Sequence, residues 1–205
     1  MAEPSRAFER QQPLSKPLPV AGLVHCLEAG KAVLFPTDTL PALASRPADA
    51  AQIWRHKARP ADKPLILMGA DLDQLQALLA VPWHPAWLAQ GRRCWPGAVT
   101  LVLPIGGAIT SWLNPGGGSL GLRVPDCEAA RELLRCSGPL ATTSANRSGE
   151  AAARDAAEAA ACFPQLPLLG PLPWPAGSGR ASTVLAWTPE TENWRTLRAG
   201  EPARG

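Results

Sequence analysis

Short apolar runs alternate with amphipathic segments along almost the whole chain, and this alternation constrains the fold more than any other feature. Apolar residues three and four positions apart are typical of a helix that faces a core, whereas about four to eight consecutive apolar or β-branched residues are typical of a buried strand. Helices are predicted at 18–29, 48–57, 71–80, 84–93, 127–136 and 151–163, and strands at 32–35, 65–68, 96–104, 120–125, 139–143, 182–187 and 194–200.

Because helices and strands are interleaved, the predicted fold class is α/β. The earlier strands are separated by helices, while the last two follow each other at hairpin-like spacing. The sheet is therefore expected to be mixed, with parallel and antiparallel pairs and about six or seven strands.

The chain has 205 residues, 46% of them hydrophobic, which suits one domain of ordinary size. We place this domain at 18–200, with a disordered tail at 1–17 and a second tail at 201–205. The first tail lacks the apolar core of a secretion signal, and no apolar run reaches the roughly 18 to 20 residues that span a bilayer. We therefore expect a cytoplasmic protein without membrane contact.

The positive charge of the chain is mild, because 20 Lys and Arg face 17 Asp and Glu, a net charge of +3. Of the 20 basic residues 16 are Arg, whose forked guanidinium suits bidentate anion binding, although a compositional bias of the source genome explains this ratio equally well. The excess is too small for a dedicated nucleic-acid binder, so a small anion is the first ligand to consider.

The five cysteines form no Cys-x-x-Cys pair, and the three histidines do not lie near them at the spacing of metal ligands. We expect reduced cysteines and no structural metal.

Two pairs of polar residues stand two positions apart in segments predicted to be non-helical: Lys57 with Arg59, and Ser144 with Asn146. In extended backbone such residues point to the same side, so each pair aims two polar groups at one place. A cationic pair together with a hydroxyl and an amide suits a polyphosphate. Taken singly, the cationic pair is equally consistent with a helix end in solvent, and "TSANRSG" is more often a helix cap and a turn.

Further polar residues stand where strands are predicted. Thr37, Asp38 and Thr39 directly follow the first predicted strand, at the end where open α/β sheets place ligands. Arg123 lies among apolar strand residues, so it is either exposed on an edge or turned toward a partner charge, and Arg198 raises the same question. The chain has no GxxxxGK[ST] or GxGxxG motif and no convincing nucleophile with its base, so covalent catalysis is not expected.

Seven segments, taken together and in order, resemble the YrdC/TsaC family of threonylcarbamoyl-AMP synthases. They are "AVLFPTDTLPALA", "KARPADKPLILM", "WPGAVTLVLP", "LGLRVPD", "TTSANRSG", "STVLAW" and "LRAG", and they cover roughly residues 18–200. Each segment is a weak signal alone, but seven in one order at plausible spacing are hard to obtain by chance.

The resemblance implies a single YrdC-like α/β domain of the short type, in which a twisted mixed sheet with flanking helices surrounds a deep, positively lined cavity. It implies a nucleotidyltransferase that converts L-threonine, bicarbonate and ATP to threonylcarbamoyl-adenylate and pyrophosphate. A threonylcarbamoyl-transferase complex would then pass the group to adenosine next to the anticodon of tRNA. ATP would be a substrate accompanied by Mg²⁺, with no tightly bound cofactor.

The resemblance also implies roles for particular residues. The family signature falls on the expected catalytic residues Lys57, Arg59, Ser144 and Asn146, and these four together with Thr142 and Arg198 are expected to bind ATP. The residues expected to bind threonine and the carbamate are Thr37, Thr39, Arg123 and Ser182.

The chain departs from the family pattern at one place that concerns the amino-acid pocket. Pro41 and Ala42 stand where the family usually has an aromatic residue followed by Gly. Two alternatives stay open beside the synthase. One is a catalytically drifted relative that binds double-stranded RNA, tRNA or the ribosome, and the other is a relative that acts on another carbamoyl compound.

Overall fold

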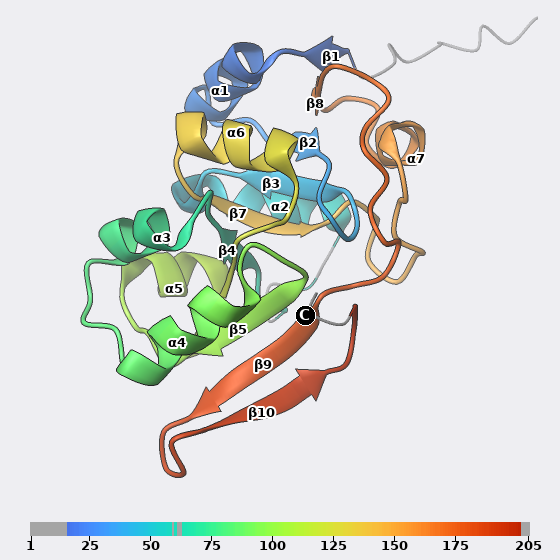
Figure 1. The fold of residues 1–205 in the computed structure, drawn as a ribbon. Coiled ribbons are helices and arrows are strands. Elements are labelled where there is room, and N and C mark those ends of the chain that lie inside the picture. The colour runs from blue at the N-terminus through green and yellow to red at the C-terminus, as the bar shows by residue number, and fades with distance from the viewer. Residues whose placement is uncertain (1–15, 59, 61–62, 202–205) are drawn as a thin grey trace, which may run out of the picture.

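The computed structural model describes residues 16–58, 60 and 63–201 of the chain. Most of the predicted N-terminal tail and four of the five residues of the predicted C-terminal tail lie outside this part. Within it, the strands form one mixed sheet in the order β1-β8-β2-β3-β7-β4-β6-β5-β9-β10 (Figure 1). The strands are β1 (Pro17–Leu18), β2 (Val33–Phe35), β3 (Ala42–Ser45), β4 (Ile66–Met68), β5 (Val99–Leu103), β6 (Leu120–Arg123), β7 (Leu140–Ser144), β8 (Leu168–Leu169), β9 (Thr183–Thr188) and β10 (Asn193–Arg198).

The predicted fold class is confirmed, but the predicted count of six or seven strands is wrong, because the described residues contain ten. Strands β1 and β8 have two residues each, too few for a periodicity to register. Strand β3 was missed because its sequence, "ALAS", is short and rich in alanine. The pairs β1–β8, β2–β8, β4–β6 and β5–β9 are parallel, and the other neighbours are antiparallel.

The predicted helices all form, with shifted ends, the one at 48–57 as a 3-10 turn followed by a helix, and one further helix appears at Ala108–Leu113. The helices are α1 (Val20–Glu28), α2 (Ala51–Lys57), α3 (Leu72–Leu79), α4 (Pro85–Cys94), α5 (Ala108–Leu113), α6 (Glu128–Ser137) and α7 (Ala156–Cys162), with a 3-10 turn, η1, at Pro47–Asp49. Helix α7 begins later than predicted because the Asp155 carboxylate accepts a bond from the Glu158 amide and caps the helix there. Upstream, the Ala153 amide bonds instead to the Ala145 carbonyl beyond β7.

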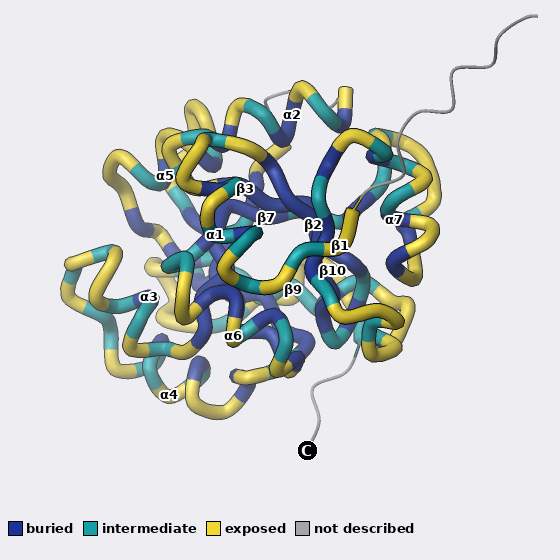
Figure 2. The backbone as a smooth tube through the Cα atoms, turned by 90° about the horizontal axis from the view of Figure 1, so that it is seen from above, coloured by how far each residue is buried: buried dark blue, intermediate teal, exposed yellow. Residues whose placement is uncertain are grey.

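Two apolar clusters cover the two faces of the sheet. On β2, Val33 and Phe35 enter the smaller cluster, which α1 and α6 cover, while Leu34 between them enters the larger cluster. Helices α2, α3, α4, α5 and α7 contribute buried residues to the larger cluster. The buried residues are therefore mostly in the central strands, and the exposed residues lie mostly on the surrounding helices and loops (Figure 2).

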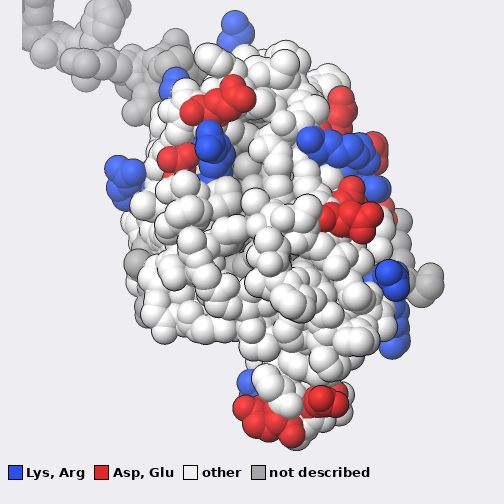
Figure 3. All heavy atoms as spheres, turned by 90° about the vertical axis from the view of Figure 1, so that its left-hand side faces the viewer, with Lys and Arg blue, Asp and Glu red and all other residues white. Residues whose placement is uncertain are grey.

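The charged side chains are unevenly spread on the face shown in Figure 3. Its middle is largely uncharged, and acidic side chains gather at the protruding β9–β10 hairpin. Within the described ranges, no helix combines the length and the apolar character needed to span a bilayer.

Candidate functional site

A cavity of about 440 Å³ lies on the same face of the sheet as α1 and α6, beside the part that they cover, because Ala42 and Met68 line the cavity and also belong to the smaller cluster. Alternation along the strands decides which residues line it. On β5, Thr100 and Val102 line the cavity while Leu101 and Leu103 enter the larger core cluster. The other strands that contribute side chains to its lining are β3, β4, β6, β7, β9 and β10.

Gly121 keeps the middle of this face open. A Cβ atom on Gly121 would lie 2.9 Å from the Cγ2 atom of Ile66 on β4 and 3.4 Å from the Cγ2 atom of Thr100 on β5. A larger residue there would push against both neighbouring strands, so the glycine contributes space to the cavity floor.

Arg123 is the buried cation of the cavity, and its side chain is bound on three sides. Its Nη2 atom forms an ion pair with Asp38 at 2.7 Å, Nη1 donates to the Thr39 hydroxyl at 2.9 Å, and Nε donates to the Gly97 carbonyl at 3.1 Å. Burial lowers the pKa of Arg123, and the adjacent Asp38 carboxylate acts in the opposite direction. The sequence left two placements open for Arg123, and the structure selects the one that faces a partner charge.

The loop after β2 orients its own hydroxyls. The Thr37 hydroxyl donates to the Leu40 carbonyl at 2.7 Å, lies 3.0 Å from the Thr39 hydroxyl and accepts a bond from the Thr39 amide. Both threonines are buried and line the cavity. The expectation that polar groups gather at this strand end is therefore confirmed.

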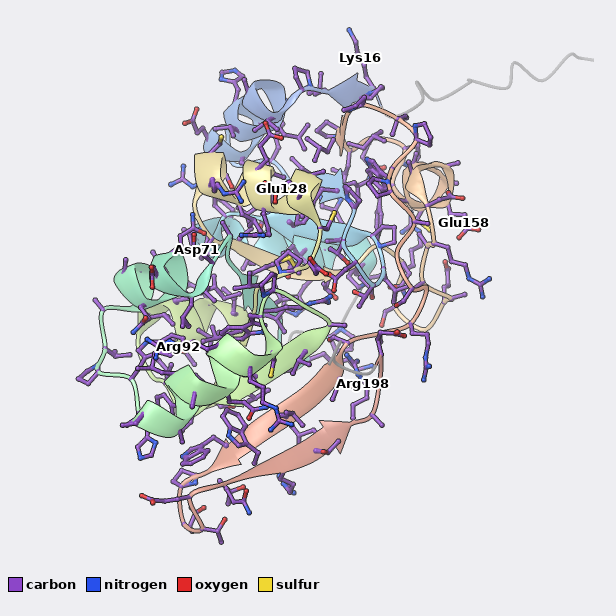
Figure 4. The ribbon with its side chains drawn as sticks, in the orientation of Figure 1. Lys16, Asp71, Arg92, Glu128, Glu158 and Arg198 are labelled. Carbon is purple, nitrogen blue, oxygen red and sulfur yellow. The ribbon has the colours of Figure 1, made fainter. Side chains whose placement is uncertain are left out.

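A second cation enters from the last strand. Arg198 donates from Nε and Nη2 to the Ser182 carbonyl at 3.1 and 2.9 Å, and from Nη2 to the Ser182 hydroxyl at 3.3 Å. The Ser182 hydroxyl also lies 2.9 Å from that of Thr100. Although the residue as a whole is exposed, desolvation of its guanidinium by the surrounding protein lowers the pKa of Arg198. Figure 4 shows Arg198 at the end of β10, beside the start of β9.

Lys57 lies behind the cavity wall and holds the turn that follows β7. Its ammonium donates to the carbonyls of Ser144 and Asn146, both at 2.6 Å, and to the Asn146 Oδ1 atom at 3.0 Å. The Ser148 amide donates to the Lys57 carbonyl in return. The premise of extended backbone at Lys57 is wrong, because it is the last residue of α2 and Ala58 after it is left-handed, with φ 49°.

Ser144 and Asn146 meet, as their spacing predicted. The Ser144 hydroxyl donates to the Asn146 Oδ1 atom at 2.7 Å, and the Asn146 amide group donates to the carbonyls of Arg147 and Glu150. The turn is thus fixed from both sides.

Most of the sequence-predicted site residues converge on the cavity. Those that line it are Thr37, Thr39, Arg123, Thr142, Ser144, Ser182 and Arg198. Lys57 and Asn146 are joined to this set through Ser144, and Arg59 lies outside the described residues.

Sequence reasoning did not assign several polar residues of the site. Asp38 was noticed as polar but given no role, although it pairs with Arg123. The unassigned residues of the lining with polar side chains are Thr100, Asn114, Ser119 and Thr143. Thr100 could have been identified from the sequence, because it is the polar residue in the otherwise apolar strand β5. In the part of the chain that the structure describes, no three His, Cys, Asp or Glu side chains come together as a metal site would require.

Comparison with known proteins places this geometry in a family. Residues 25–200 match the Sua5/YciO/YrdC family, which is described as telomere recombination. A relative from Stutzerimonas stutzeri (strain A1501), named threonylcarbamoyl-AMP synthase, is 32% identical over 149 residues, 71% of this chain and 80% of the relative. A relative of the same name from Pyrococcus abyssi is 37% identical over 129 residues, 60% of this chain, so the match spans only 37% of that longer protein.

Solved structures support the same family assignment. P. abyssi Sua5 complexed with L-threonine has 30% sequence identity and a TM-score of 0.79, over 88% of this chain and 54% of that one. Escherichia coli YciO, at 23% identity and a TM-score of 0.72 over 91% of this chain and 93% of that one, shares the fold. With the family match over residues 25–200, these findings show that the chain belongs to the Sua5/YciO/YrdC family.

Proposed function

We propose that the protein is a threonylcarbamoyl-AMP synthase, an adenylyl-transferring enzyme that uses L-threonine, bicarbonate and ATP. The observation that carries the proposal is the convergence of Arg123, Arg198 and several hydroxyls on one cavity. Support also comes from the relatives, since both curated relatives described above have the synthase name. That name favours the synthase over an RNA-binding relative without turnover.

The cavity offers two sets of polar residues, one that suits ATP and one that suits the threonine and the carbamate. We assign the phosphates of ATP to Arg198, Thr142 and Ser144, with Arg59 joining them from outside the described residues. Lys57 and Asn146 are assigned to the same end of the site. The threonine carboxylate and the carbamate are assigned to Arg123, with the hydroxyls of Thr37, Thr39 and Ser182 around them, because a buried guanidinium with adjoining hydroxyls suits a carboxylate.

The proposed reaction needs alignment and charge neutralisation more than a protein nucleophile. Threonine and bicarbonate form the carbamate with loss of water. A carbamate oxygen then attacks the α-phosphorus of ATP, and the bond to the leaving pyrophosphate breaks. Negative charge spreads over the phosphoryl oxygens, where Arg198 and the hydroxyls of β7 would stabilise it.

Magnesium would accompany the nucleotide in this proposal. The chemistry of the described residues suits an ion held by phosphates and water, because the lining of the cavity contributes hydroxyls and guanidinium groups and no carboxylate cluster. The product would pass to a threonylcarbamoyl-transferase complex in the cytoplasm, and from there to tRNA.

The test is release of pyrophosphate by the purified protein with ATP, Mg²⁺ and bicarbonate. L-threonine, L-serine and no amino acid are compared in parallel. We expect release that depends on threonine. Equal release without an amino acid, or none under any condition while ATP still binds, would refute the synthase.

A further inference from the structure

A second cavity, of about 560 Å³, lies next to the first. It is bounded by the loop after β2, by the start of α7 and by residues 174–180, a segment that we call the strap. The strap belongs to the connection between β8 and β9, which runs past α7 (Figure 1). Thr37 lines both cavities, so the two share a wall.

Part of the lining of the second cavity is apolar. Pro36 and Pro41 are buried at its floor. Trp174 lines it while its indole N–H donates to the Leu169 carbonyl at 2.6 Å, which fixes the plane of the ring. A fixed aromatic ring with proline faces nearby suits a planar apolar ligand group.

The rim of the second cavity has charged side chains of both signs. Arg154 lies just before the N-cap of α7, and Arg180 is the last residue of the strap. Both line the cavity and both are exposed. Two carboxylates lie close: Asp155 caps α7 by accepting from the Glu158 amide, and Glu201 lies 3.7 Å from the Arg180 Nε atom. The Nη2 atom of Arg180 lies 3.4 Å from the Gly200 carbonyl. An anion at the mouth would thus meet the Arg154 guanidinium and would compete with Glu201 for the Arg180 guanidinium.

The strap itself is a poor cradle for a buried phosphate. Three successive amides already have acceptors: Ser178 donates to the Asp38 carbonyl at 2.9 Å, Gly179 to the Thr39 carbonyl at 3.0 Å, and Arg180 to the Ser178 hydroxyl at 3.3 Å. An anion is therefore favoured at the rim, and the apolar group of the ligand at the floor.

We propose that the second cavity is a nucleotide-binding site, in which a base lies against Trp174 and the floor prolines while its phosphate lies between Arg154 and Arg180. A free mononucleotide and a nucleotide within an RNA strand present the same chemistry. The site goes beyond the proposed synthase reaction and does not depend on it.

The test follows the backbone amides of Gly177 and Gly179 in the strap by NMR while AMP is added to the full chain. The amide of Gly121 reports on the first cavity in the same spectra. The doubly substituted protein Arg154→Glu/Arg180→Glu is compared with Arg92→Glu/Arg93→Glu, which makes the same charge change at two exposed positions of α4.

We expect AMP to shift the strap amides and the Arg154→Glu/Arg180→Glu protein to bind it at the strap at least about tenfold more weakly, with the α4 control unchanged. Any shift of the Gly121 amide on addition of AMP should persist in both substituted proteins. Any threonine-dependent release of pyrophosphate at saturating ATP should also persist in both. The proposed site would be overturned if AMP did not shift the strap amides. It would also be overturned if the Arg154→Glu/Arg180→Glu protein showed the same shifts as the original. Loss of pyrophosphate release with the strap response intact would count against the synthase only.

Two further probes identify the ligand. Inorganic pyrophosphate should bind the strap more weakly than AMP, and equal binding would overturn the role given to the base. A single-stranded RNA of roughly eight nucleotides is then compared with AMP. Tighter binding of the RNA with the same dependence on Arg154 and Arg180 would point to an RNA strand as the source, and binding of AMP alone to a free nucleotide.

Discussion

Lys57 and Asn146 are 89 positions apart in the chain, yet the Lys57 ammonium lies 2.6 Å from the Asn146 carbonyl oxygen and 3.0 Å from its side-chain oxygen. Together with the Ser144 carbonyl, these oxygens are acceptors from the described residues for an ammonium that can donate three protons. The side chain is buried, so the charge replaces its hydration with these oxygens. Lys57 thus ties α2 to the turn that presents Ser144 to the cavity.

Lys57→Met should destabilise the protein and impair catalysis together. The substitution leaves partly buried carbonyls of the turn without their donor, which should lower the free energy of unfolding by about 2 kcal/mol. Pyrophosphate release should fall in the same protein. Urea unfolding and the release assay measure the two effects, with Lys63→Met, at an exposed lysine, as the control. Unchanged stability would contradict the structural part of this argument.

Arg198→Ala should raise the KM for ATP without unfolding the protein. Arg198 is exposed and bonded only locally to Ser182 among the contacts described above, so its loss costs the fold little. A guanidinium–phosphate contact typically contributes enough to change the KM about ten- to a hundredfold. Steady-state kinetics with varied ATP provide the measurement, and Arg195→Ala on the same strand should leave the KM near its original value.

Ala42→Gly should change the KM for threonine more than the KM for ATP. The Pro41–Ala42 departure from the family pattern divides between the two cavities, because Ala42 lines the first and Pro41 the second. Removing the Ala42 methyl group enlarges the first cavity near Thr37 and Thr39, where we place the amino acid. Ala44→Gly, two residues along the same strand and outside the lining, controls for the backbone effect of glycine. Equal changes for both substrates would disprove this placement.

His56 should make the protein less stable in acid. Its pKa lies below the ordinary value of 6.5 because the ring is partly buried and because Arg55 and Arg147 repel a proton on it. In the unfolded chain the ring has its ordinary pKa, so below about pH 6.5 the unfolded state binds more protons than the folded state. The free energy of unfolding therefore falls as the pH falls through that window.

His56→Gln removes this contribution. Between about pH 7.5 and about pH 5 the variant should lose less stability than the original protein in urea unfolding, since only the original takes up this proton on unfolding. Gln165, whose Nε2 atom lies 3.3 Å from the ring Nδ1 atom, stays in place in both proteins. Parallel pH profiles would show that His56 does not contribute.

The parts of the site that the sequence predicted are those set by strand alternation. Arg123 is polar at a position where its neighbours on β6 point into the core, so its side chain had to face the other side of the sheet. Ser144 and Asn146 also meet as their spacing predicted, but they do so in a turn, because β7 ends at Ser144 and the Asn146 amide donates to the Ser144 carbonyl. These properties are local and can be read from a few adjacent residues.

The contacts of Lys57 and Asp38 could not be predicted from adjacent residues in the sequence. Lys57 binds residues that are 87 and 89 positions away, and Asp38 binds Arg123 at a separation of 85. No local pattern specifies partners at such distances, because the order of strands in the sheet brings them together. The two-residue strands β1 and β8 were missed for the same reason, since their pairing is defined by each other and by β2.

The position of β9 has a consequence for how the protein is made. During synthesis, β2 to β8 leave the ribosome before residues 182–198, while β5 awaits its parallel partner β9. Until that partner arrives, β5 presents the unpaired backbone of an apolar strand, a feature that promotes association between nascent chains. The docking of β9 and β10 pairs this edge, leaves the largely exposed strand β10 as the new edge and delivers Ser182 and Arg198 to the cavity, so the apolar edge is covered in the same step in which the lining of the cavity becomes complete.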